Sequence, residues 1–105
     1  MCGITGVTNF SKKIINNDKL LKMTHALKHR GPDDIGFWIS ENRKIGFGHT
    51  RLAIIDLSKF GSQPIISESK RYVLVYNGEI YNYISLKKKL GKTVKFKGSS
   101  DTEVL

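Results

Sequence analysis

The chain begins with Met-Cys-Gly-Ile-Thr-Gly-Val-Thr (residues 1–8), and the predictions of both fold and chemistry start from this stretch. Isoleucine and valine are interspersed with small residues over 3–8, a pattern that predicts a short strand. Cys2 is the single cysteine of the chain, which excludes an intrachain disulfide and a cysteine-rich zinc site. Its place directly after the initiator methionine makes it the first candidate for catalysis.

Cys2 becomes the first residue of the chain if the methionine is removed, because a small second residue permits that removal. It then carries a thiol and a free α-amine on one carbon framework. A thiol needs a base within hydrogen-bond reach to become an efficient nucleophile, and the amine supplies that base without a histidine. Gly3 is expected to leave the thiol open to a substrate. The alternative is that Cys2 is a small apolar residue at the start of a buried strand.

The composition is that of one small globular domain, since the 105 residues are 39% hydrophobic and 26% charged. The net charge of +9 keeps a basic binding module as an alternative. Lysine supplies 14 of the 18 basic residues, without interleaved aromatics, which favours solvated faces over a nucleic-acid surface. No apolar run approaches the ~20 residues of a membrane span, and the chain does not begin with a secretory signal. We therefore expect a cytoplasmic protein.

The first half of the chain is predicted to contain a helix over 18–30, with Asp18 as its N-cap and Gly31-Pro32 as its stop signal. Two strands that form a hairpin are predicted after it. A buried strand and a loop follow them. In order, these elements are strands over 36–39 and 44–48, a strand over 52–55 and a loop over 58–64.

The second half is predicted to contain the strongest strand of the chain over 72–76, by its β-branched and aromatic residues. This strand ends at the turn dipeptide Asn77-Gly78. A helix is predicted over 81–90, with Ile84 and Leu90 inside and Lys87–Lys89 outside, and one more strand over 94–96. Ser100 and Glu103 have the spacing of a capping box. A helix that starts so close to the last residue indicates a chain that continues beyond Leu105.

Four later segments carry polar residues in a distinctive order. They are His-Arg-Gly-Pro-Asp (29–33), His-Thr-Arg-Leu-Ala-Ile-Ile-Asp (49–56), Asn-Gly-Glu-Ile-Tyr-Asn (77–82) and Ser-Ser-Asp-Thr-Glu (99–103). Together with Met-Cys-Gly-Ile at 1–4, they resemble the class II glutamine amidotransferases, which are N-terminal-nucleophile hydrolases. The forms of 29–33 and 77–82 resemble the asparagine synthetase branch.

The resemblance implies an α+β fold, a four-layer αββα sandwich with two facing antiparallel sheets between helical layers. Residues 1–105 would then be a truncated glutamine amidotransferase type 2 domain that starts at Cys2, with its C-terminal part and a synthetase domain absent. Arg30 is expected to be structural and to brace the catalytic end of the sheet.

The resemblance also assigns catalytic roles. Cys2 is the nucleophile that attacks the side-chain amide of glutamine. The side-chain amide of Asn77 and the backbone N–H of Gly78 would stabilise the oxyanion that forms on attack. Without the resemblance, Asn77-Gly78 is better interpreted as a plain turn after a strand.

Free glutamine offers a carboxylate and an ammonium group for recognition. A carboxylate calls for a planar bidentate donor, which Arg51 provides. The ammonium calls for a carboxylate, which Asp101 provides, although helix capping accounts for Asp101 as well. The resemblance places Glu79 beside the ammonium. It also implies that the strand after Arg51 lines the pocket, with Leu52, Ala53, Ile54 and Ile55.

The expected reaction is hydrolysis of glutamine through a Cys2 thioester, which supplies ammonia. The resemblance implies that a second domain uses this ammonia, with ATP and Mg²⁺, to convert aspartate to asparagine. Residues 1–105 are expected to need no cofactor or metal and to bind neither nucleic acid nor a membrane. A homodimer is left open. The alternatives are an amidotransferase for another acceptor, such as a sugar or cell-envelope precursor, and an inactive fragment.

Overall fold

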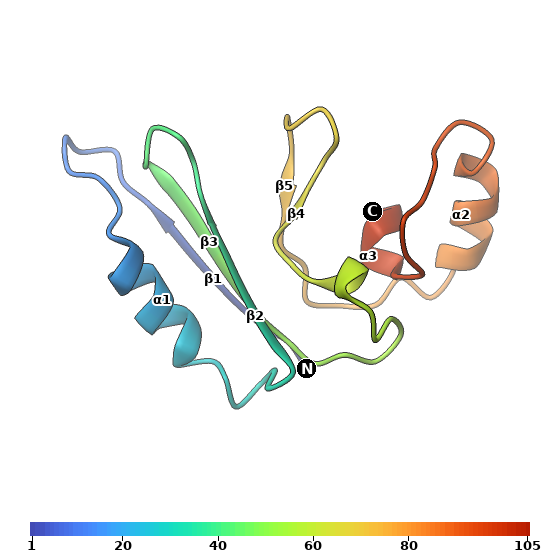
Figure 1. Cartoon of the computed structure of the whole chain (residues 1–105), viewed down its shortest axis with the longest axis horizontal. Coiled ribbons are helices and arrows are strands. Elements are labelled where there is room, and N and C mark those ends of the chain that lie inside the picture. Colours follow the sequence, from blue (N-terminus) through green and yellow to red (C-terminus); the bar gives the residue numbers. More distant parts are fainter.

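A computed structural model describes all residues 1–105 and shows two antiparallel sheets with helices outside them. In Figure 1, helix α1 lies on the outer side of one sheet, whereas helices α3 and α2 lie beyond the other. The predicted α+β class with antiparallel sheets is confirmed. The first sheet has the strand order β1-β3-β2, formed by β1 (Gly3–Thr8), β2 (Asp34–Ile39) and β3 (Ile45–Arg51); the second pairs β4 (Ile65–Ile66) with β5 (Val73–Leu74).

The three-stranded sheet contains the strand and hairpin that the sequence predicts. Strand β3 lies in the centre and pairs antiparallel with both neighbours, so that Gly3 lies opposite Thr50 and Ile39 opposite Gly46. The hairpin strands are longer than predicted because the pairing continues from Gly46 to Arg51. This register places the start of β1 beside the end of β3, at the same end of the sheet.

Helix α1 (Asn17–His25) packs on this sheet with Leu20 fully buried. Its N-cap is Asn16, whose side chain accepts the N–H groups of Asp18 and Lys19, so the predicted N-cap at Asp18 is wrong. Two glycines of β3 allow the close approach. A Cβ atom on Gly46 would lie 3.0 Å from Leu20, and one on Gly48 would collide with Thr24.

The predicted helix over 18–30 is too long at its C-terminal end. From Leu27 onward, backbone N–H groups bind the carbonyl three residues earlier in the chain, which gives tight turns. The Leu27 N–H binds the Thr24 carbonyl, and the Arg30 N–H binds the Leu27 carbonyl. Gly31 then packs directly against the backbone of Thr50 and Arg51. These turns place Arg30 at the end of the sheet where β1 starts.

The predicted buried strand over 52–55 does not form, because the pairing ends at Arg51. The next two backbone N–H groups bind side chains instead of a strand: Leu52 binds the sulfur of Cys2, and Ala53 binds the Asp33 carboxylate. Ile54 is 64% exposed, so the segment is not buried either. It continues into a short 3-10 helix, η1 (Lys59–Gly61), inside the predicted loop.

The predicted strand over 72–76 is mostly irregular, and only Val73 and Leu74 pair with β4. Tyr76 does not continue the ladder, because its N–H binds the side chain of Gln63. The turn at Asn77 therefore follows an extended segment that is held by a side chain.

Helix α2 (Tyr83–Leu90) confirms the second predicted helix, but it has no buried residue, and both Ile84 and Leu90 are exposed. Lys87 does not point outward, since it covers the Phe96 ring at 4.8 Å and donates to the Gly98 carbonyl. The predicted strand over 94–96 is absent. No helix in the structure has both the length and the apolar character that crossing a membrane requires.

Helix α3 (Asp101–Val104) has Ser100 as its N-cap, and the Ser100 side chain accepts the Thr102 N–H. The predicted capping box is incomplete. The Glu103 carboxylate binds the N–H groups of Lys97 and Gly98 rather than that of Ser100. These bonds hold the segment before α3 in an irregular conformation.

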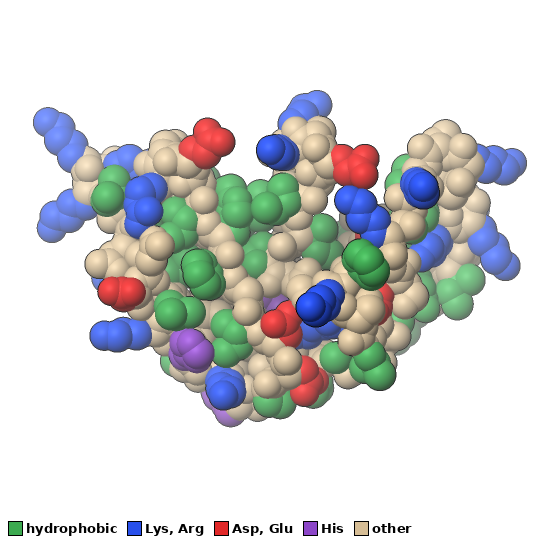
Figure 2. All heavy atoms as spheres, in the orientation of Figure 1, with side chains coloured by type: hydrophobic (Ala, Val, Ile, Leu, Met, Phe, Trp, Pro, Cys, Tyr) green, Lys and Arg blue, Asp and Glu red, His purple; other side chains and the backbone are tan.

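The basic side chains lie in separate groups on the face seen in Figure 2, with hydrophobic side chains gathered between them.

Candidate active site

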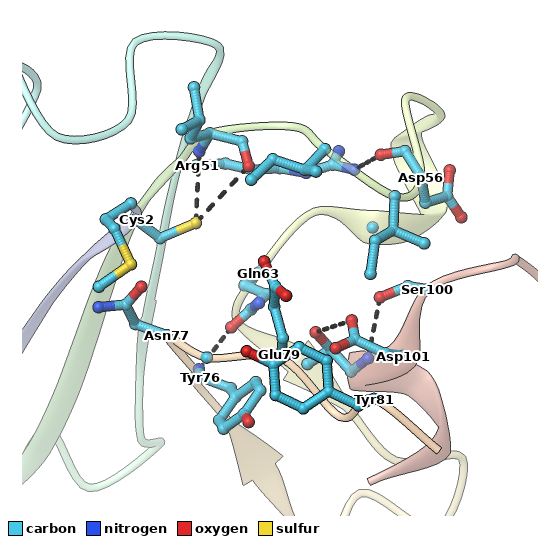
Figure 3. Close-up of a pocket in the computed structure, with 17 residues that line it drawn as sticks. Cys2, Arg51, Asp56, Gln63, Tyr76, Asn77, Glu79, Tyr81, Ser100 and Asp101 are labelled. Atoms are coloured by element: carbon cyan, nitrogen blue, oxygen red, sulfur yellow. Dashed lines mark hydrogen bonds between the residues drawn. The ribbon is translucent and has the colours of Figure 1, made fainter. Parts of the chain in front are cut away.

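All of the predicted site residues except Ala53 line one cavity of about 230 Å³. The cavity lies between two halves of the molecule, one with the three-stranded sheet and the other with β4, β5 and the helices after them. Cys2 precedes β1, Arg51 ends β3, Asn77 and Gly78 follow β5, and Asp101 begins α3. In the view of Figure 3, Cys2 and Asn77 lie at one end of the cavity, whereas Ser100 and Asp101 lie at the other. A thiol, an amide, a guanidinium and a carboxylate therefore face one space.

Cys2 is positioned by the register of the first sheet. Because β1 and β3 are antiparallel, Cys2 lies beside the segment that follows Arg51, and its sulfur accepts the Leu52 N–H at 3.3 Å. The Arg30 Nε donates to the Cys2 carbonyl at 3.1 Å, which agrees with the predicted bracing role. Met1 is 70% exposed and lines the cavity as well.

Gly3 has a different role from the one predicted. It does not line the cavity. A Cβ atom at this position would lie 2.6 Å from the Thr50 hydroxyl and 2.8 Å from the Leu27 Cβ. The glycine is therefore required by packing behind the strand, and access to the thiol does not depend on it.

Arg51 is 8% exposed, and its guanidinium is held by the loop that follows it. Nη1 donates to the Ser58 carbonyl at 2.8 Å, and Nη2 donates to the Asp56 carbonyl. Gly61 leaves the space for this arrangement, because a Cβ atom there would collide with Nη2. A guanidinium has five N–H donors, so the loop carbonyls leave some of them for a ligand in the cavity.

Asp56 links this loop to the segment before α3. Its Oδ1 accepts the Ser58 N–H at 2.7 Å and its Oδ2 accepts the Ser99 N–H at 2.8 Å. A hydrogen bond from the Ser58 side chain, together with the Ser99 and Ser58 backbone bonds, holds the pKa of the Asp56 carboxyl far below its ordinary value. Asp56 is therefore a carboxylate that organises the backbone around the cavity.

The Asn77-Gly78 turn contacts the side chain of Tyr76, the residue before it. A Cβ atom on Gly78 would lie 2.5 Å from the Tyr76 hydroxyl, so the aromatic ring folds back over this glycine. Glu79 follows the turn and lines the cavity. The turn therefore presents Asn77, Gly78 and Glu79 to the same space as Cys2.

Asp101 connects the far end of the cavity to this turn. It is buried, and its Oδ2 accepts the N–H of Ile80 at 2.9 Å. The Thr102 hydroxyl lies 3.4 Å from Oδ1. The Asp101 carboxylate thus fixes the residue that follows Glu79 and also lines the cavity.

Of the residues predicted after Arg51, Leu52, Ile54 and Ile55 line the cavity, whereas Ala53 does not. The Ala53 N–H binds Asp33 instead. The sequence analysis did not assign several other residues that line the cavity. Gln63 stands in a segment interpreted only as a loop, and nothing in its neighbourhood indicates a site. The other unassigned lining residues are Met1, Asp56, Gly61, Tyr76, Tyr81, Ser100 and Thr102.

A model of the glutamine amidotransferase domain family matches residues 1–105. The chain belongs to this family, as the sequence predicts. It is 43% identical over 109 residues to glutamine-hydrolysing asparagine synthetase 1 of Bacillus subtilis, and 37% identical over 106 residues to glutamine-hydrolysing asparagine synthetase B of Escherichia coli. It is also 38% identical over 115 residues to amidase chry2 of Gibberella zeae.

All of the chain is covered in each comparison, but only 17% to 19% of each of these three relatives is covered. The chain thus spans about a fifth of the length of the curated relatives that it matches.

Proposed function

We propose that the chain hydrolyses the side-chain amide of glutamine through a thioester on Cys2. The observation that carries this proposal is the convergence of Cys2, Arg51, Asn77 and Asp101 on one cavity from four separate segments. Membership of the glutamine amidotransferase domain family supports glutamine as the substrate. In this proposal the two sheets are the inner layers of a four-layer αββα sandwich.

Binding uses the opposite charges of free glutamine. The guanidinium donors of Arg51 that the loop leaves free bind the α-carboxylate. The carboxylates of Asp101 and Glu79 receive the α-ammonium, and Leu52, Ile54 and Ile55 form the apolar part of the cavity wall. The side-chain amide then extends toward Cys2 and Asn77, at the end of the cavity opposite Asp101.

The chemistry requires a free amine on Cys2. The exposure of Met1 leaves it accessible for removal. The amine takes the thiol proton as the sulfur bonds to the amide carbon, and the oxyanion is stabilised by the Asn77 side chain and the Gly78 N–H. The amine returns the proton to the departing nitrogen, and ammonia leaves a γ-glutamyl thioester. Water, deprotonated by the same amine, then releases glutamate and restores the thiol.

The destination of the ammonia is proposed from the relatives named as asparagine synthetases. A further domain would use ATP and Mg²⁺ to activate aspartate, and the ammonia would complete asparagine. A second candidate is an amidotransferase for a different acceptor. It is kept because one relative of comparable identity, amidase chry2 at 38%, is not named as an asparagine synthetase.

The test measures glutamate release from glutamine by the complete natural polypeptide that contains residues 1–105, called the complete protein below. Cys2→Ser and Cys2→Ala are expected to abolish it and to leave any synthesis from free ammonia intact. Glutamate release at the unsubstituted rate by Cys2→Ala would contradict the proposal. Replacing aspartate with other acceptors in the same assay separates the two destinations of the ammonia.

A further inference from the structure

The backbone of Tyr76, the residue that precedes Asn77, is held from two sides. The Gln63 Oε1 accepts the Tyr76 N–H at 2.6 Å, and the His49 Nε2 lies 3.3 Å from the Tyr76 carbonyl oxygen. A carbonyl oxygen only accepts hydrogen bonds, so the Nε2 must carry the proton and donate it. Both backbone polar groups of Tyr76 are thus bound by side chains. Figure 3 shows the Gln63 bond directly beside the turn.

His49 is placed rigidly for this contact. It is 1% exposed and lies in the central strand β3, opposite Ile4 on one side and Gly36 on the other. Its Nδ1 is buried without a hydrogen-bond partner. Burial lowers the pKa of His49, so the imidazole is neutral and keeps its single proton on Nε2. A buried, neutral histidine with a fixed tautomer is a directional donor.

Gln63 is fixed by the same sheet. It is 7% exposed, and its backbone carbonyl packs where a Cβ atom on Gly36 of β2 would lie. Both His49 and Gln63 are therefore anchored to the three-stranded sheet, whose first strand begins beside Cys2. Tyr76 belongs to the other half of the molecule, after β5. The two bonds cross from the half that carries the thiol to the half that carries the turn.

We propose that His49 and Gln63 are positioning residues that hold the Asn77-Gly78 turn at a fixed place relative to Cys2. This inference rests on the proposed function. Neither residue reacts with glutamine; both act through the backbone of Tyr76. Oxyanion donors stabilise the transition state only when they are placed to within a fraction of an ångström. A turn that is not held loses this stabilisation even though Asn77 and Gly78 are unchanged.

The kinetic test compares matched pairs of variants in the complete protein. Gln63→Leu and His49→Leu remove the acceptor and the donor, and each is expected to lower kcat for glutamate release by about 10- to 100-fold. The KM for glutamine should change by less than about threefold, because the lost interactions support the transition state. Gln63→Glu keeps an acceptor oxygen and His49→Gln keeps a donor, so both should retain most of the kcat.

A control variant lies in the hairpin formed by β4 and β5, at the end opposite Gln63 and Tyr76. The Ser67 hydroxyl accepts the Tyr72 N–H at 3.1 Å, so Ser67→Ala also removes a side-chain acceptor for a backbone N–H. It is expected to leave kcat unchanged. Unchanged kcat in Gln63→Leu and His49→Leu would overturn the inference, as would an equal loss of kcat in Ser67→Ala.

Hydrogen exchange tests the same inference without catalysis. In Gln63→Leu the amide hydrogens over 76–78 should exchange faster than in the unsubstituted protein, whereas Ser67→Ala should leave them unchanged. Unchanged exchange over 76–78 in Gln63→Leu would overturn the positioning role. Failure of the proposed function has a different signature, since glutamate release would then be absent or would survive Cys2→Ala.

Discussion

The Asp56 carboxylate accepts the Ser99 N–H at 2.8 Å and so joins two segments that lie 43 residues apart in the sequence. The backbone carbonyl of the same residue accepts a hydrogen bond from Arg51. Asp56 therefore connects the loop that holds the guanidinium to the segment that precedes Asp101. The two residues proposed to bind the α-carboxylate and the α-ammonium of glutamine are thus placed relative to each other through Asp56, by its backbone carbonyl on one side and its carboxylate on the other.

Asp56→Asn is expected to destabilise the protein by about 1–3 kcal/mol, because the amide cannot accept at both of its terminal atoms. The pKa of Asp56 is lowered in the folded state, so the carboxylate contributes stability fully above the unfolded pKa of about 4. That contribution is lost as the pH falls below this value. Denaturant unfolding at pH 7 and at pH 3 measures the difference between the variant and the unsubstituted protein. If the difference in the free energy of unfolding between the two proteins were the same at pH 7 and at pH 3, this account would be contradicted.

Gly61→Ala should raise the KM for glutamine without changing any charge. The added methyl group collides with Nη2 of Arg51 and displaces the guanidinium from the two loop carbonyls. We expect an increase in KM of about tenfold or more, since a bond between charged groups contributes about 1.5–3 kcal/mol. The control is Gly6→Ala, where the nearest atom to a Cβ is 3.7 Å away. Equal KM values in the two variants would remove Arg51 from the binding site.

Arg51→Lys tests the same contact by changing the shape of the cation. Lysine keeps the charge but cannot form a bidentate fork or bind the Ser58 and Asp56 carbonyls together. A higher KM for glutamine is therefore expected, with a smaller effect on kcat. Steady-state glutaminase kinetics measure both, and an unchanged KM would show that the carboxylate of glutamine binds elsewhere.

Asp101→Asn separates the electrostatic role of this residue from its structural role. The amide oxygen of asparagine still accepts the Ile80 N–H, so the thermal midpoint of unfolding should change little. The negative charge is lost, so glutamine should bind at least about tenfold more weakly. An unchanged KM, with a lowered thermal midpoint, would indicate that Asp101 only holds the backbone at Ile80.

Most residues that line the cavity lie within the sequence motifs, although only about half of the lining was predicted residue by residue. Residue propensities were a poorer guide to the secondary structure. The segments 52–55 and 72–76 are rich in isoleucine, valine and leucine, which favours strands. In each segment, strand pairing stops where a distant side chain binds a backbone N–H. The Cys2 sulfur binds the Leu52 N–H, and the Gln63 side chain binds the Tyr76 N–H. Such captures depend on the three-dimensional arrangement and leave no local pattern in the sequence.

The same cause explains two smaller errors. Ala53 was predicted in the pocket, but the Asp33 carboxylate binds its N–H. The predicted strand over 94–96 does not form, because the Glu103 carboxylate binds the N–H groups of Lys97 and Gly98, the two residues after this segment. Gly3 is predicted to keep the thiol accessible, whereas in the structure it packs against Leu27. This contact cannot be foreseen from the sequence, because it depends on how the chain turns after α1 ends at His25.

The central claim is that the free α-amine of Cys2 is the base of the reaction, and the N-terminus offers the most direct test. The complete protein is produced with an N-terminal extension that a protease removes to leave Cys2 as the first residue. Glutamate release is measured on the same sample before and after cleavage, with intact mass confirming each state. We predict activity only after cleavage, because the extension converts the amine into an amide nitrogen. Equal activity before and after cleavage would contradict the account.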